Sequence, residues 1–90
     1  MSLEKAAIDA AHNALEQGDA RGCLAQLDAY DRMFPRGMLR PEATLVRIDA
    51  LASSGDRARA RSLADSFLAR DPTSPYADRI RSMIDGPSNP

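Results

Sequence analysis

The sequence predicts an all-α protein of five helices, arranged as antiparallel helical hairpins. Apolar residues recur at three- and four-residue steps through five segments, and glycine or proline ends each segment. Ala is the commonest residue and Trp is absent, so the core must form by close helix contacts over small side chains. Because 90 residues bury only roughly 60 to 65% of the surface of the extended chain, we expect a single core.

The first hairpin is predicted over residues 4–34. Its first helix, 4–17, has Ser2 available as N-cap and ends before Gly18-Asp19. Its second helix, 20–34, is stopped by Pro35. The predicted apolar stripes are Leu3, Ala7, Ile8, Ala11, Ala14 and Leu15 in the first helix, and Cys23, Leu24, Leu27, Tyr30 and Phe34 in the second.

The second hairpin is predicted over residues 40–70, with helices at 40–54 and 57–70. Pro41 suits the first turn of a helix, Gly55-Asp56 marks the turn between the two helices, and Asp71-Pro72 ends the hairpin.

A fifth helix is predicted at 75–84, with Ser74 as N-cap and Pro75 at the first helical position. We expect this helix to cap the second hairpin, and residues 4–84 to form one domain. The tail, residues 85–90, is expected to be disordered. Residues 1–3 look like a leader added for expression, so we expect the targeting segment of a longer protein to have been left off.

The strongest feature of the sequence is an internal repeat of 37 residues. Gly18-Asp19 recurs as Gly55-Asp56, and Pro35 recurs as Pro72. A period of this size with two helices per unit predicts a solenoid, in which each hairpin buries its apolar face by stacking on a neighbour.

These residues resemble the tetratricopeptide repeat. The pattern of that family is a Gly-Asp between two helices, a small residue five positions after the Gly, an aromatic residue in the second helix and a closing Pro. The sets that fit it are Gly18, Cys23, Tyr30 and Pro35 in the first copy, and Gly55, Ala60, Phe67 and Pro72 in the second. The first helix of each copy departs from the pattern, with Ala7 and Ala10, then Thr44 and Arg47, where a large aromatic residue and a leucine are expected.

The resemblance implies a short right-handed solenoid that acts as a non-enzymatic protein-protein interaction module. Three extra residues after Pro35 are similar to the longer-period variant found in bacterial envelope proteins, such as the TolA-binding division coordinator and outer-membrane assembly lipoproteins. This implies the C-terminal part of a larger envelope or regulatory protein, in the periplasm or envelope. A cytoplasmic regulatory adaptor and a self-associating module that forms a homodimer remain alternatives.

The resemblance also implies a groove for a protein or peptide partner, lined by the first helix of each copy. A mixed face of this kind would favour a peptide with apolar anchors and a basic group, and the alternative is a solvated face. By alignment, the groove residues are Lys5, Ile8, His12 and Glu16, and then Glu42, Leu45, Asp49 and Ser53.

The charge pattern argues against nucleic-acid binding. Residues 1–45 carry 5 basic and 7 acidic side chains, hence −2, and residues 46–90 carry 7 and 6, hence +1. The run Arg57, Arg59, Arg61 is divided between helix faces and has Asp56 beside it, so we expect a salt-bridged surface there.

No residue set predicts catalysis, a cofactor or a metal ion. Cys23 occupies the small-residue position that Ala60 holds in the second copy, so we interpret it as a packing thiol. His12 lies four residues before Glu16, a spacing typical of a surface pair. No apolar run reaches the ~20 residues that span a bilayer, so we expect no membrane insertion by this segment.

Overall fold

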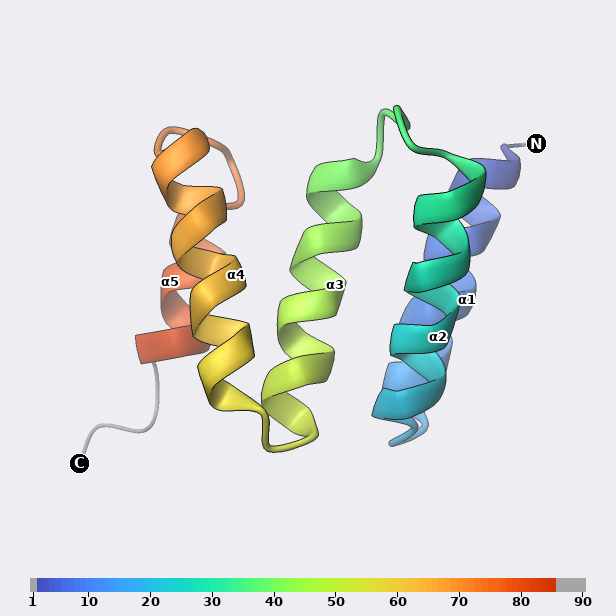
Figure 1. Ribbon diagram of the computed structural model, residues 1–90, viewed down its shortest axis with the longest axis horizontal. Coiled ribbons are helices and arrows are strands. Elements are labelled where there is room, and N and C mark those ends of the chain that lie inside the picture. Colours follow the sequence, from blue (N-terminus) through green and yellow to red (C-terminus); the bar gives the residue numbers. More distant parts are fainter. Residues whose placement is uncertain (1, 86–90) are drawn as a thin grey trace.

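The computed structural model describes residues 2–85 and contains five helices there. They are α1 (Leu3–Glu16), α2 (Ala20–Met33), α3 (Arg40–Ser53), α4 (Arg57–Arg70) and α5 (Ala77–Asp85). α1 and α2 form one antiparallel hairpin, α3 and α4 form the second, and α5 packs against α3 and α4 (Figure 1). The predicted all-α hairpin array is confirmed, with four helices within one residue of their predicted bounds.

The repeated Gly-Asp has a specific structural role in both hairpins. Gly18 and Gly55 have φ of +82° and +91°, a conformation that favours glycine. The amide of the following Asp donates back to the carbonyl five residues earlier, as Asp19 to Ala14 and Asp56 to Leu51, each at 2.9 Å. This pattern ends one helix with a Schellman motif.

The same Asp then begins the next helix. An oxygen of Asp19 accepts from the Gly22 amide at 2.8 Å, and an oxygen of Asp56 accepts from the Arg59 amide at 3.2 Å. Both are N-caps. Ser2 caps α1 in the same manner, accepting from the Lys5 amide at 3.1 Å, as predicted.

The predicted start of the fifth helix is wrong by two residues. Ser74 Oγ accepts from the Tyr76 amide at 3.1 Å and the Ser74 carbonyl accepts from the Ala77 amide at 3.0 Å, so Ser74-Pro75-Tyr76 is a turn that precedes the helix. The repeat explains the true start, because Ala77 lies 37 residues after Arg40, where α3 begins. α5 reaches Asp85, and the rest of the predicted tail lies outside the described residues.

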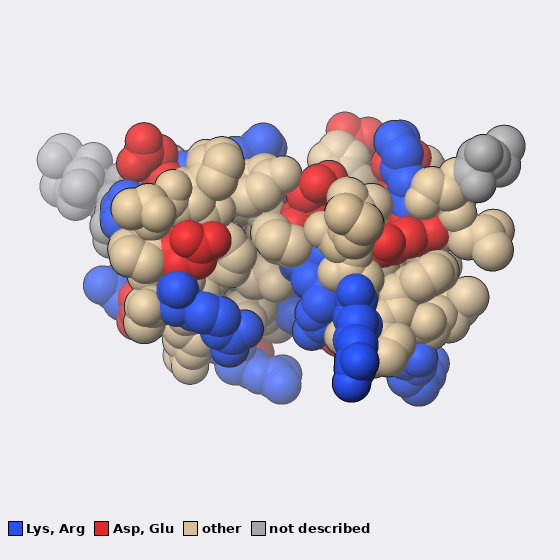
Figure 2. Space-filling model, turned by 90° about the horizontal axis from the view of Figure 1, so that it is seen from above, with Lys and Arg blue, Asp and Glu red and all other residues tan. Residues whose placement is uncertain are grey.

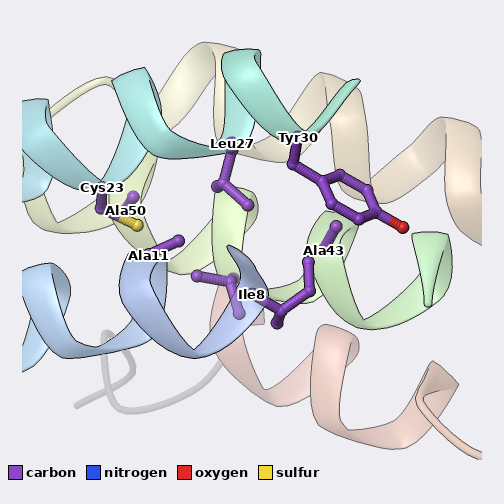
Figure 3. Close-up of a cluster of buried hydrophobic side chains, with 8 residues drawn as sticks. Ile8, Ala11, Cys23, Leu27, Tyr30, Ala43 and Ala50 are labelled. Atoms are coloured by element: carbon purple, nitrogen blue, oxygen red, sulfur yellow. The ribbon is translucent and has the colours of Figure 1, made fainter. Parts of the chain in front are cut away.

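α3 is the centre of the core. Its apolar residues enter two clusters, one shared with α1 and α2 and one shared with α4 and α5. Figure 3 shows how the first cluster forms from side chains of all three helices. Its members are Ile8, Ala11, Cys23, Leu27, Tyr30, Ala43, Val46 and Ala50.

Leu3 was predicted to belong to the apolar stripe of the first helix, but it lies outside the core with 72% of its surface exposed. It is the first residue of α1 and belongs to neither buried cluster.

A partly buried carboxylate network joins the ends of the first hairpin to the next helix. Glu4 Oε2 accepts from the Tyr30 hydroxyl at 2.5 Å and from the Leu39 amide at 2.8 Å. A Cβ at Gly37 would collide with both the Glu4 carboxylate and the Tyr30 hydroxyl, so glycine permits this approach. The hydrogen bond from Tyr30, then that from Leu39, lowers the pKa of Glu4, whereas burial and Glu4 raise the pKa of Tyr30 to about 12.

Stability should depend on the packing of α5. Ile80 is fully buried against α3 and α4, so Ile80→Ala should lower the free energy of unfolding by about 2–5 kcal/mol in urea denaturation. The exposed neighbour Arg81 provides the control, and Arg81→Ala should change it by less than about 0.5 kcal/mol. Removal of residues 75–90 should lower Tm further, and a truncated protein with an unchanged Tm would contradict a capping role.

The Glu4 network should give a defined pH dependence. Because folding lowers the pKa of Glu4, its stabilisation is present above the unfolded value of 4.5 and is lost as the pH falls below it. Because folding raises the pKa of Tyr30 from 10 to about 12, its contribution is complete below pH 10 and is lost as the pH rises towards 12. When Tm from thermal melts is plotted against pH, Glu4→Gln should reduce the fall in Tm at acid pH. Tyr30→Phe should reduce the fall in Tm at alkaline pH.

Candidate functional site

α1, α3 and α5 line a cleft of about 310 Å³. Figure 2 looks down on the ends where these helices begin, and its upper outline is indented between the right-hand lobe and the left-hand lobe. The lining residues are Ile8, Asp9 and His12 from α1, Glu42, Leu45, Val46 and Asp49 from α3, Tyr76 from the preceding turn, and Arg79 and Met83 from α5.

The cleft has an apolar floor and a predominantly acidic rim. Ile8, Leu45 and Val46 are each at least 92% buried, since they also belong to the core clusters. The charged lining residues are three carboxylates, Asp9, Glu42 and Asp49, and one guanidinium, Arg79. With His12 neutral, these side chains have a formal charge of −3 + 1 = −2.

Five of the eight groove residues predicted from the sequence line this cleft, namely Ile8, His12, Glu42, Leu45 and Asp49. The other three do not. Lys5 Nζ binds Asp9 Oδ2 at 2.9 Å, Glu16 Oε2 lies 3.7 Å from His12 Nδ1, and Ser53 is exposed at the end of α3. That this face binds a partner stays a prediction.

The sequence comparison of two hairpins missed the contribution of the fifth helix. None of the residues that line the cleft from the fifth helix and the turn before it, Tyr76, Arg79 and Met83, was among the predicted groove residues. The signal was nevertheless present, because Arg79 and Met83 lie 37 residues after Glu42 and Val46. α5 is thus the first helix of a third repeat, and its residues complete the far wall of the cleft.

Tyr76 and Glu42 lie together at one side of the cleft. Burial, followed by the charge of Glu42 and a hydrogen bond with it, raises the pKa of Tyr76. Tyr76 therefore stays neutral at physiological pH and presents a hydrogen-bonding hydroxyl beside an acidic group.

Cys23 behaves as the predicted packing thiol. It is fully buried, as is its repeat equivalent Ala60 at 2% exposure. Burial, reinforced by the charge of Asp49, raises the pKa of Cys23, which disfavours the reactive thiolate. Within residues 2–85, no three His, Cys, Asp or Glu side chains are grouped as metal ligands would be.

The opposite face carries a second cleft of about 420 Å³, between α2, α3 and α4. Arg47 lies in it and binds Asp28 at 3.0 Å and Asp31 at 2.8 Å. An arginine at this position departs from the leucine of the tetratricopeptide pattern, and its ion pairs to α2 account for the departure. Arg59 lies 3.7 Å from Asp56, in line with the predicted salt-bridged surface.

Two hairpins with Gly-Asp turns, small residues at the helix crossings and a fifth helix in the register of a third repeat define a short tetratricopeptide-like array. A family model described as outer membrane lipoprotein, YfiO, matches residues 2–85, and the chain belongs to that family. Comparison with curated proteins and with solved structures found no match. None of the helices in the described part of the chain is long and apolar enough to cross a membrane.

The burial of Cys23 predicts low reactivity. A maleimide should label the native protein at least about 100 times more slowly than the protein in denaturant, because labelling requires the thiolate and solvent access. Cys23→Ala should be tolerated, as Ala60 is in the second repeat, whereas Cys23→Leu should cost about 1–3 kcal/mol by overpacking. Rapid native labelling would contradict a structural role for this thiol.

Proposed function

We propose that this chain is a non-enzymatic protein-interaction module of a bacterial envelope protein, and that the α1–α3–α5 cleft holds a peptide segment of a partner protein. The observation that carries the proposal is the cleft itself, in which an apolar floor and an acidic rim converge from three helices. Helices held by a buried core provide a preformed site, which reduces the entropy lost on binding.

The location in the envelope is supported by the family to which the chain belongs, whose description is outer membrane lipoprotein. This description favours an envelope scaffold over a cytoplasmic regulatory adaptor. The chain would then contribute a binding surface to a larger assembly, and chemistry would lie elsewhere.

The charge of the cleft defines the kind of peptide. Glu42 and Asp49 come from α3 and Asp9 from α1; Lys5 already pairs with Asp9, and Arg79 is the one cation among the lining residues. A segment with apolar anchors would contact Ile8 and Leu45, and a Lys or Arg beside each anchor would neutralise the rim.

The proposal can be tested with two short peptides, in which Leu alternates with Lys or with Glu. By fluorescence anisotropy, the Leu/Lys peptide should bind about tenfold more tightly, as expected for two or three partly exposed ion pairs. Glu42→Arg with Asp49→Arg should reverse this preference. The substitutions are placed on the rim and not on the floor of the cleft. Leu45 on the floor is only 8% exposed, so a charged residue at that position would disturb the core.

A matched control changes the same amount of charge outside the cleft. Asp65→Arg with Asp78→Arg alters two exposed carboxylates on α4 and α5 and should retain the preference for the Leu/Lys peptide. If the control also loses the preference, long-range charge explains it. If neither peptide binds the native domain, this cleft is not a peptide site.

A further inference from the structure

Three large apolar side chains are exposed in the described part of the chain, and all three lie at the same end of the molecule. Leu3 is 72% exposed, Met33 is 65% exposed and Met38 is 89% exposed. Leu3 begins α1, Met33 ends α2, and Met38 lies in the loop that leads to α3. Figure 1 shows this loop at the top, close to the first turn of α1.

The Glu4 network holds these three segments together. Its carboxylate binds the Tyr30 hydroxyl, three residues before Met33, and the Leu39 amide, directly after Met38. The exposed side chains are therefore carried by a fixed framework. We call Met33 and Met38, together with the neighbouring exposed Arg32 and Arg36, the apolar tip, and leave Leu3 out of it because residues 1–3 look like an added leader.

The uncompensated charge of the apolar tip is positive. Within residues 2–85, neither Arg32 nor Arg36 forms an ion pair. Glu42, near the start of α3, lines the cleft and is not paired with either arginine. Several charged side chains of the adjoining segments are engaged: Lys5 with Asp9, Arg40 and Arg47 with Asp31, and Glu4 with Tyr30.

We propose that the apolar tip docks on the surface of a bilayer that contains anionic phospholipid. Neither of its two apolar residues lines the clefts described above, so the tip projects and does not enclose a partner. Projecting apolar side chains can enter the boundary between headgroups and acyl chains, while adjacent arginines bind lipid phosphates. This surface uses different residues from the proposed peptide cleft and adds a second contact to it.

The test is co-sedimentation of the whole 90-residue chain with two kinds of vesicle, phosphatidylcholine alone and phosphatidylcholine mixed with phosphatidylglycerol. The native protein should bind the mixed vesicles and should be released at high ionic strength. Arg32→Gln with Arg36→Gln should weaken binding about 25-fold, at about fivefold for each arginine. Met33→Ser with Met38→Ser should weaken it by about tenfold or more, because apolar side chains leave the interface.

The matched control is Arg57→Gln with Arg61→Gln, which removes the same charge from the part of α4 at the opposite end of the molecule. This variant should bind within about twofold of the native protein if position, and not total charge, is decisive. All substituted residues are exposed, and circular dichroism would show that each variant keeps its helical content.

Failure of the native protein to bind mixed vesicles, or equal loss in the control, would overturn the proposal. If vesicles do not bind but the methionine variant loses a protein that the native chain captures, the tip is a protein contact and the bilayer proposal is wrong. Both tip variants should keep the preference of the cleft for the Leu/Lys peptide, so the two proposals fail independently.

Discussion

The structure depends on the burial of α3 from two sides at once. Ile48 and Ala50 have no exposed surface, and they belong to different clusters, one facing α4 and α5 and the other facing α1 and α2. Neither hairpin has enough apolar surface to form a core alone, because a chain of this size exposes much of its side-chain area. α3 therefore contributes buried side chains to both clusters, and this shared helix joins the two repeats into one cooperative unit.

α5 solves the problem that this arrangement creates at the open end. A second hairpin that ended with α4 would leave one side of α3 and α4 in water, and Ala77 and Ile80 cover it. Because α5 stands in the register of a first helix, it lies beside α3 as α3 lies beside α1. The same helix therefore completes the core on one side and the cleft wall on the other.

Much of the fold could be predicted because the 37-residue repeat and the Gly-Asp turn motifs indicate the same two hairpins. Gly-Asp predicted both hairpin turns, and the positive φ of Gly18 and Gly55 is the physical reason. The start of α5 was misjudged because a local Ser-Pro signal was preferred to the register of the repeat. The Glu4–Tyr30 hydrogen bond could not be predicted, because it joins residues 26 apart and no local sequence pattern indicates it. Arg79 was missed because only two repeats were aligned, and it lies in the third.

The sharing of residues between core and cleft limits how binding specificity can be encoded here. Ile8, Leu45 and Val46 form the floor, yet each is more than nine-tenths buried in a cluster that stabilises the fold. A change at these positions alters stability before it alters recognition, since cores tolerate little change in volume. The rim residues Glu42, Asp49 and Arg79 carry no such constraint, because they lie partly or fully exposed. Discrimination between partners must therefore reside mainly in the charges of the rim, with the floor providing a less selective apolar contact.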